Sequence, residues 1–323
     1  MKKQLLIAAV AATMGTAAMA DVSITGDAKF EYFNTETSTV STNKTNTEVN
    51  LGIKGKNGDT TVVANLEFNT HDAASNMDIE DLYMTTKIGD VTVKGGNYAT
   101  GTSAILGEIE NGGRASNKVT LSGSTGGVSW YAGNSATVGA GATQINGNMF
   151  VGASMDVAGW KVQAKHNSAT VDSFGISGEV SGVGIRLEQK NDTAANGDTT
   201  FGNVTYSTNG IDLAYAWLDS DKANQIDEDD SAIFAVENGI VTATTDTGNA
   251  QITAKTSVAG NTVTVKSGSV ENGIATGTDL DYTQIAVSRP LASGATFAAT
   301  YTDKDDSATT DTQILELDLS VKF

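Results

Sequence analysis

The sequence has no cysteine, a single proline and only three arginines, Arg114, Arg186 and Arg289, among its 323 residues. The lack of cysteine excludes a disulfide framework, thiol catalysis and a thiolate metal site. Scarce arginine and a formal net charge of −18 argue against nucleic acid as a partner, because phosphates are bound by clustered Lys and Arg. After residue 20 no apolar run approaches the roughly 18–20 residues that a membrane-spanning helix needs. The chain is instead rich in glycine, with 35 residues, and in Thr, Asn and Ser, which is typical of short strands joined by turns.

The first twenty residues have the order of an export signal. A basic start at Lys2 and Lys3 precedes a mostly apolar stretch, and Ala18-Met19-Ala20 matches the small-x-small pattern of a cleavage site. We therefore expect residues 1–20 to be a signal peptide. Residues 21–323 are expected to form one exported domain, because no linker or change of composition divides them.

From Asp21 onward, apolar and polar residues alternate. In the first such stretch Val22, Ile24 and Phe30 fall on one face, while Asp27 and Lys29 fall on the other. Alternation over about 8–12 residues is typical of a β-strand, whose successive side chains point to opposite faces. Short turns also alternate with longer polar stretches, as in the hairpins of a membrane barrel with unequal rims. The pattern predicts an all-β protein, a transmembrane antiparallel β-barrel.

The number of strands depends on how one segment is interpreted. Thirteen hairpin arms precede Leu218 and three follow Asp279, which makes sixteen. Residues 219–278 are ambiguous, because 240–245, 251–256 and 262–266 also have strand character. They form either a hairpin inside one long outer loop or additional strands of the wall. Sixteen strands are therefore predicted, with eighteen as the alternative.

The two faces of these strands differ in a way that favours a membrane barrel. Charged residues occupy mid-strand positions on the polar face, and aromatic residues lie near strand ends on the apolar face, which predicts a water-lined interior and aromatic belts at the membrane interfaces. A soluble β-sandwich would also alternate, but its core is usually richer in Leu and Phe and its turns in Pro. The aromatic residues are Phe30, Tyr32, Phe68, Trp160, Tyr215, Trp217, Tyr301 and Phe323.

Both ends of the exported domain resemble those of Gram-negative general porins, notably the alphaproteobacterial ones. The matching segments are 21–30 (DVSITGDAKF) and 315–323 (LELDLSVKF). The resemblance implies a sixteen-stranded, homotrimeric, water-filled pore that lets small hydrophilic solutes diffuse across the cell outer membrane. It also implies contact with outer-membrane lipid and lipopolysaccharide, and insertion by the barrel-assembly machinery, for which the terminal Phe323 belongs to the assembly signal.

In that family the third long loop folds inward and narrows the pore. The corresponding loop here is Asn97 to Ser116, and Glu108 and Glu110 are its expected constriction acids. An acid facing a base sets up a transverse field that filters solutes by charge. Lysines replace the arginine cluster of the family, which predicts a wider or less rigid constriction, because an ammonium does not stack as a guanidinium does. The expected pore-lining bases are Lys29, Lys54, Lys87, Lys94 and Lys118.

These features favour a passive outer-membrane channel with a weak preference for cations, because the chain is strongly acidic. Neither an aromatic nor an arginine ladder is evident on the expected lumen face, so a general channel is favoured over a solute-specific one. The alternative function is that of a secreted or surface β-rich adhesin whose acidic loops bind calcium.

Catalytic and metal-binding motifs are missing. His71 and His166 are the only histidines and no Gly-x-Ser-x-Gly occurs, so we expect no enzyme activity. The acidic stretch 219–230 lacks the glycine and the final glutamate of an EF-hand loop, and an outer loop is expected there. We expect no cofactor and no metal site, with weak Ca²⁺ or Mg²⁺ binding at the outer loops as the alternative.

Overall fold

A computed structural model describes residues 21–70, 76–98, 115–137, 146–168, 171–192, 197–221, 234, 246–272, 279–306 and 311–323. The expected signal peptide, residues 1–20, lies outside the described residues. Across the described part of the chain, no helix is both long enough and apolar enough to cross a membrane.

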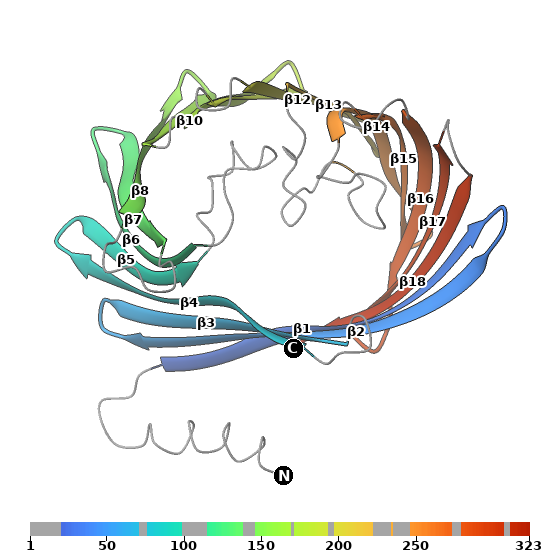
Figure 1. The fold of residues 1–323 in the computed structure, drawn as a ribbon, viewed down its shortest axis with the longest axis horizontal. Coiled ribbons are helices and arrows are strands. Elements are labelled where there is room, and N and C mark those ends of the chain that lie inside the picture. The colour runs from blue at the N-terminus through green and yellow to red at the C-terminus, as the bar shows by residue number, and fades with distance from the viewer. Residues whose placement is uncertain are drawn as a thin grey trace, which may run out of the picture.

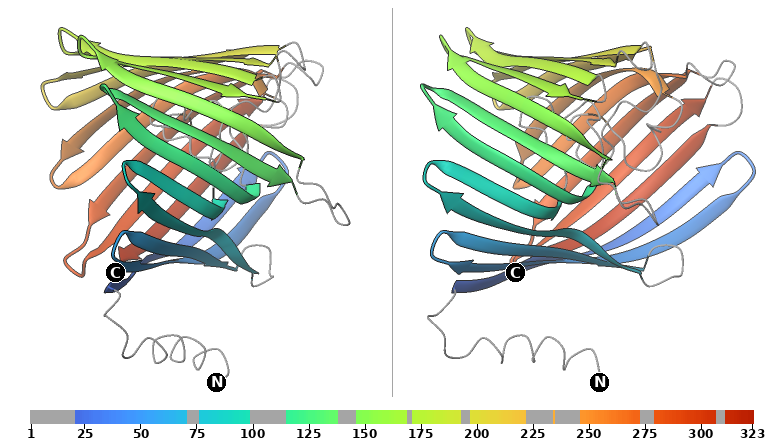
Figure 2. Two further views of the ribbon diagram at one scale, coloured as in Figure 1. Left: turned by 90° about the vertical axis from the view of Figure 1, so that its left-hand side faces the viewer. Right: turned by 60° about the vertical axis from the view of Figure 1, so that its left-hand side comes forward.

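Eighteen antiparallel strands join edge to edge into one closed sheet, a barrel whose wall is seen end-on in Figure 1 and from the side in Figure 2. Each strand pairs with its neighbours in sequence, and the first strand also pairs with the last. The strands are β1 (Asp21–Thr37), β2 (Ser41–Asn57), β3 (Thr60–Asn69), β4 (Asn76–Ile88), β5 (Val91–Tyr98), β6 (Ala115–Thr125), β7 (Val128–Thr137), β8 (Asn146–Val157), β9 (Trp160–Asn167), β10 (Val171–Val180), β11 (Val183–Asp192), β12 (Gly197–Thr208), β13 (Ile211–Ser220), β14 (Asp246–Val258), β15 (Asn261–Asn272), β16 (Leu280–Pro290), β17 (Ala295–Asp306) and β18 (Thr312–Lys322).

The prediction of sixteen strands is wrong, and the difference lies in the segment that the sequence left ambiguous. Thirteen strands precede this segment and three follow it, as expected, but β14 and β15 are added to the wall between β13 and β16. A hairpin confined to an outer loop would leave its two outer edges unpaired. Pairing within the wall satisfies the backbone groups of both edges, which is required where no water is available.

The connections at one end of the barrel are tight turns, and we refer to this end as the short-turn end. At the β12–β13 turn Asn209 and Gly210 both have positive φ, 50° and 77°. Two successive residues in this region form the type I′ turn that matches the twist of a two-residue hairpin. The opposite end, which carries the longer connections, is the long-loop end.

Strand register separates two chemically different faces. Ile24, Phe30 and Leu319 lie on the outer face and are 57%, 48% and 46% exposed. The eight aromatic residues expected at strand ends occupy outward positions as well, which agrees with the predicted belts. A second set of aromatic residues, spread over seven strands, faces the lumen. These are Phe33, Tyr83, Tyr98, Tyr131, Phe150, Phe201 and Tyr282.

The barrel closes where β1 meets β18. The Gly26 amide donates to the Phe323 oxygen and the Phe323 amide donates to the Gly26 carbonyl, each at 2.9 Å. The Phe323 ring lies over Gly26 on the outer face, where a Cβ on Gly26 would approach the ring to 2.9 Å. Phe323, for which the resemblance to porins implies a part in an assembly signal, therefore also completes the seam of the folded barrel.

The contact between Gly26 and Phe323 can be tested by Gly26→Ala. The added methyl group would overlap both the Asn50 carbonyl and the Phe323 ring, and overpacking of this kind costs about 1–3 kcal/mol. We expect the folded barrel to lose its heat-modifiable migration in detergent gels at a lower temperature. Gly55→Ala, on the same face with open space around its Cβ position, is the matched control. Equal unfolding temperatures of the two variants would contradict this account of the seam.

Candidate pore-lining site

One sector of the lumen wall is acidic. Register and side-chain contacts place seven carboxylates on β1–β4 and β18, and we call this group the acidic face. Four of its members, Glu31, Glu48, Glu67 and Glu316, line an open recess of about 840 Å³ together with Lys29, Lys44 and Lys304. The acidic face consists of Asp27, Glu31, Glu48, Glu67, Asp81, Glu316 and Asp318.

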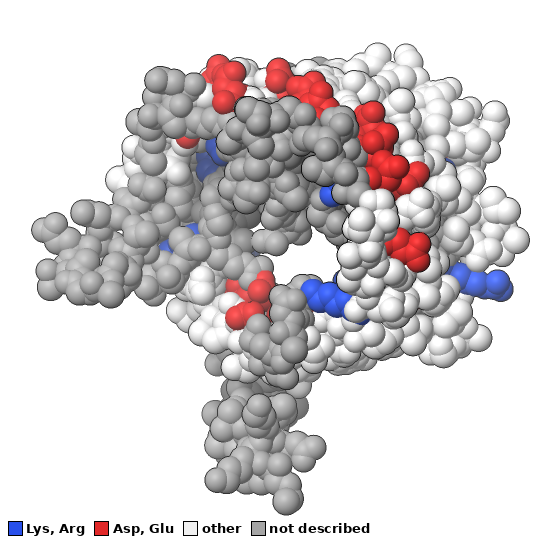
Figure 3. All heavy atoms as spheres, turned by 45° about the vertical axis from the view of Figure 1, so that its right-hand side comes forward, with Lys and Arg blue, Asp and Glu red and all other residues white. Residues whose placement is uncertain are grey.

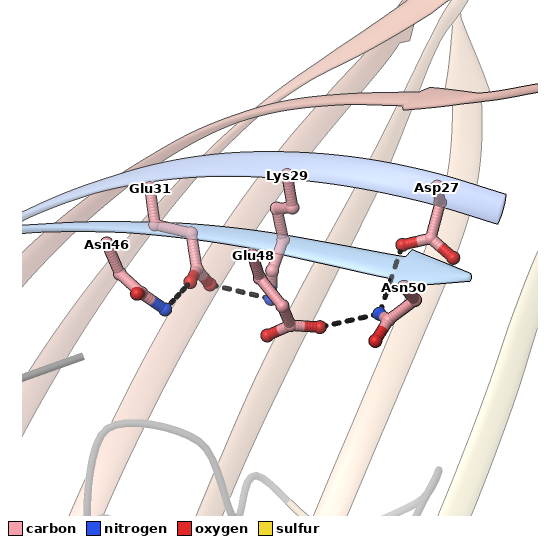
Figure 4. A network of polar contacts seen from close by, with 6 residues as sticks. All are labelled: Asp27, Lys29, Glu31, Asn46, Glu48 and Asn50. Atoms are coloured by element: carbon pink, nitrogen blue, oxygen red, sulfur yellow. Dashed lines mark hydrogen bonds and ion pairs between the residues drawn. The ribbon is translucent and has the colours of Figure 1, made fainter. Parts of the chain in front are cut away.

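Neighbouring polar side chains hold these carboxylates in place (Figure 4). The Glu31 carboxylate accepts a hydrogen bond from Asn46 Nδ2 at 2.8 Å and pairs with Lys29 Nζ at 2.7 Å. Asn50 Nδ2 donates to Glu48 at 2.7 Å and to Asp27 at 3.3 Å. The Asn46 and Asn50 amides reach across from β2 to carboxylates on β1, and Asn50 also contacts Glu48 on its own strand. These hydrogen bonds keep the carboxylates oriented toward the lumen.

The same arrangement continues on the next two strands. Asn65 Nδ2 donates to Asp81 at 2.8 Å, and Asn69 Nδ2 donates to Glu67 at 2.6 Å. An amide stabilises a carboxylate without neutralising it, because it supplies a hydrogen bond and no charge. The acidic face therefore retains most of its negative charge.

Three of these acids gather tightly at the seam of the barrel. Carboxylate oxygens of Glu31, Glu316 and Asp318 lie within 4.8 Å of one another, and Glu31 and Glu316 are 6% and 4% exposed. Oxygen ligands at this spacing suit a hard cation. Here the ammonium of Lys29 contacts Glu31 directly, so part of the charge is compensated by the chain itself.

An adjoining sector of the wall is basic. It comprises Lys94 on β5, Lys118 on β6, Lys165 on β9 and Lys190 on β11, which we call the lysine cluster. Like-charge interactions couple Lys118 to Lys94 and Lys165, and couple Lys165 to Lys190. Such a group of ammonium ions raises the local concentration of anions.

Aromatic rings support the lysine cluster. Lys94 Nζ lies 3.8 Å from the centroid of the Tyr83 ring and 3.9 Å from that of Tyr98. Lys118 is only 1% exposed, and its Nζ donates to the Tyr98 carbonyl at 2.6 Å. Ring faces attract cations, so Tyr83 and Tyr98 hold the charge of Lys94 at the wall.

The five bases expected from the sequence all occupy lumen-facing positions, but they lie in three different parts of the lumen. Lys94 and Lys118 meet in the lysine cluster. Lys29 lies instead within the acidic face, and Lys54 and Lys87 are exposed near the short-turn end. The loop acids Glu108 and Glu110 lie outside the described residues, so their place at a constriction stays a prediction.

The sequence analysis did not assign four residues of this site, namely Lys165, Lys190, Tyr83 and Tyr98. Lys165 and Lys190 are far from Lys118 in the chain, and only the register of β6 to β11 brings them to one sector. The sequence could have indicated that Tyr83 faces the lumen, because Tyr83 alternates in phase with the charged residues Asp81 and Lys87 of the same strand.

Acidic side chains also collect outside the lumen. Exposed aspartates point outward near the long-loop end of β12, β13, β16 and β17, and Figure 3 shows acidic side chains gathered along one part of the rim. A negatively charged rim concentrates cations at the mouth. These residues are Asp198, Asp219, Asp281, Asp303 and Asp305.

The lysine cluster can be tested by Lys118→Met, with Lys118→Arg as the control that keeps the charge. At about 7 Å in water one unit charge changes the energy of a passing ion by about 0.6 kcal/mol, which is nearly threefold in local concentration. We expect Lys118→Met to shift the reversal potential of a bilayer channel under a KCl gradient toward cations by a change of this size. Identical reversal potentials for the two variants would show that the cluster does not act on ions in transit.

No protein-family model and no curated protein matches the chain. Several solved structures have a similar fold. OpdK of Pseudomonas aeruginosa with vanillate has a TM-score of 0.68 at 13% identity, covering 94% of this chain and 98% of that one. OccK2 (OpdF) of the same organism, in complex with glucuronate, has a TM-score of 0.67 at 11% identity, with coverage of 94% and 98%.

A structure from another organism is similar to the same extent. OccAB4 of Acinetobacter baumannii has a TM-score of 0.65 at 10% identity, covering 95% of this chain and 99% of that one. Another structure of OpdK bears the description outer membrane protein and matches with a TM-score of 0.66 at 12% identity. At such low identity the likeness concerns the fold alone, and this chain has the closed barrel fold of these proteins over nearly its whole length.

Proposed function

We propose that the chain forms a water-filled outer-membrane channel through which small hydrophilic solutes and ions diffuse passively. The observation that carries this proposal is the division of the closed wall, with aliphatic side chains outside and amide-held carboxylates and lysines inside. An apolar exterior suits lipid and a charged interior suits water. A soluble adhesin would have no use for an aliphatic outer surface around a charged interior.

The remaining expectations from the sequence become part of this proposal. Residues 1–20 direct export, and the barrel inserts with the help of the assembly machinery that reads the end at Phe323. It functions as a homotrimer among outer-membrane lipid and lipopolysaccharide, without a cofactor and without enzyme activity. Weak Ca²⁺ or Mg²⁺ binding at the outer loops would accompany the negatively charged rim.

We propose a weak preference for cations on the basis of charge. Described lumen positions carry acidic and basic residues side by side, whereas the described outward charges at the long-loop end are carboxylates. The whole chain has a formal net charge of −18. Cations therefore accumulate at the mouth, and Glu108 and Glu110 are proposed to extend this preference into the constriction.

A second candidate, a solute-specific channel for small carboxylates, is favoured by the lysine cluster. Lys94, Lys118, Lys165 and Lys190 offer several ammonium groups on one sector, with tyrosines beside them. Two structurally similar proteins were solved with vanillate and with glucuronate, both of which carry a carboxylate. Lysines bind such groups by charge-assisted hydrogen bonds.

The general proposal is tested by recording the refolded mature protein in a planar bilayer. Stepwise conductance in groups of three, with a cation-leaning reversal potential under a salt gradient, is the expected result for a trimeric pore. Replacing Glu108 and Glu110 by Gln should reduce that preference, because two negative charges are removed. Folded and inserted protein that conducts nothing would contradict the channel and favour the surface-binding alternative.

Uptake by proteoliposomes separates the two candidates. A general channel passes glucose and glucuronate at rates set by size and the weak charge preference. A carboxylate-specific channel passes glucuronate faster, with a rate that saturates and falls in Lys118→Met while Lys118→Arg retains it. A linear glucuronate rate that is unchanged by Lys118→Met would contradict the specific channel.

A further inference from the structure

The open recess beside the barrel seam is lined by charges of both signs. Four carboxylates and three ammonium groups from β1–β3, β17 and β18 surround its volume of about 840 Å³. This volume falls within the range of about 300–1,000 Å³ that is typical of small-molecule sites. We call it the mixed-charge recess, and its charged residues are Lys29, Lys44, Lys304, Glu31, Glu48, Glu67 and Glu316.

Three of these charged residues are engaged within the protein. Glu31 and Glu316 are only 6% and 4% exposed, and the Lys29 ammonium pairs with the Glu31 carboxylate at 2.7 Å (Figure 4). Lys29 therefore compensates part of the buried negative charge. A solute that enters the recess meets the half-buried Glu48 and Glu67 more readily.

Glu48 and Glu67 belong to a small square of acids and amides on β2 and β3. In register Glu48 is paired with Asn69, and Asn50 with Glu67. Asn50 Nδ2 donates to Glu48 Oε1 at 2.7 Å, and Asn69 Nδ2 donates to Glu67 Oε1 at 2.6 Å.

This square leaves one oxygen of each acid available. Across the ranges that the structure describes, Oε2 of Glu48 and Oε2 of Glu67 take part in no hydrogen bond or ion pair. The amides orient the carboxylates without neutralising them. The square is therefore suited to accept hydrogen bonds from a solute ammonium group.

Two bases lie on the side of the recess nearer the long-loop end. Lys44 precedes Glu48 by four residues on β2, so their Cα atoms are about 13 Å apart. Lys304 of β17 is the register partner of Thr312, the first residue of β18. Because an ammonium group has three donors, each lysine can bind a solute carboxylate in addition to its contacts within the chain.

We propose that the mixed-charge recess binds small zwitterionic solutes whose ammonium and carboxylate groups are separated by several bonds. The ammonium group binds Glu48 and Glu67, and the carboxylate binds Lys44 and Lys304. A zwitterion satisfies both sides of the recess, whereas an ion of one sign satisfies one side and is repelled by the other. This inference rests on the proposed channel function and gives that channel a preferred class of solute.

The first test compares γ-aminobutyrate with butyrate and n-butylamine, which have the same carbon chain and one of its two charges each. Saturation-transfer NMR on the folded protein in detergent measures their binding without requiring conduction. We expect γ-aminobutyrate to have a Kd about two- to fivefold lower than either analogue, the contribution of one exposed ion pair. A Kd equal to or higher than that of either analogue would overturn the proposal.

The second test uses Glu67→Gln and Lys44→Gln, which change the charge of the recess in opposite directions. Because the solute is bound at both ends, both substitutions should weaken γ-aminobutyrate binding by about two- to fivefold. A general field would instead weaken binding in one variant and strengthen it in the other, and that result would overturn the proposal.

Matched controls carry the same charge changes on the outer face. Glu271 and Arg289 alternate in phase with the outward Val265 and Val287 of their strands. Glu271→Gln and Arg289→Gln should leave the Kd of γ-aminobutyrate unchanged. Effects as large as those of the recess variants would contradict a local site. Heat-modifiable gel migration confirms that each variant is folded.

Uptake by proteoliposomes separates this inference from the proposed function. We expect γ-aminobutyrate uptake to saturate, at a concentration that rises in Glu67→Gln and in Lys44→Gln. If wild-type protein conducts ions while γ-aminobutyrate uptake is linear and equal in both variants, the recess assignment is wrong and the channel stands. If folded, inserted wild-type protein passes neither ions nor solutes, the channel proposal fails and the transport role of the recess fails with it.

Discussion

Hydrogen-bond closure of the sheet is the constraint on which the other features of this structure depend. In an apolar surrounding an unpaired backbone N–H or C=O costs several kcal/mol, so a strand wall is stable there only when its first and last strands meet. The pairing of β1 with β18 meets this demand from Asp27 to Thr37. Gly26 and Phe323 extend it to the last residue of the chain. Insertion of β14 and β15 follows the same logic, since a hairpin in the wall leaves no edge unpaired.

Closure also decides what the side chains can do. Because strand residues alternate between faces, a closed wall turns one set outward and the other toward the interior. The inward set is not uniform around the circumference. Carboxylates occupy β1–β4 and β18, most of them with asparagine partners, and lysines occupy β5 to β11, where tyrosine rings contact Lys94 and Lys118. Neighbouring sectors of opposite charge produce a field across the lumen.

The third sector, from β12 to β16, is apolar and is covered in part by Phe234. Because Phe234 lies inside the wall, the lumen is narrower on this side than the wall alone would make it. The same sector contains the one described asparagine whose amide is both buried and wholly without partners.

Much of the fold could be predicted from the sequence because the period-two pattern is a local property. It identified strands, their inward and outward faces and the outward aromatic residues, and it identified Lys94 and Lys118 as lumen-facing bases. Other features depend on which strands become neighbours, which no local pattern contains. The wall positions of β14 and β15, the meeting of Lys118 with Lys165, and the placement of Phe234 against Phe201 follow only when register and closure join residues far apart in the chain. Alternation along one strand determined what each side chain faces, whereas pairing between strands decided what each side chain meets.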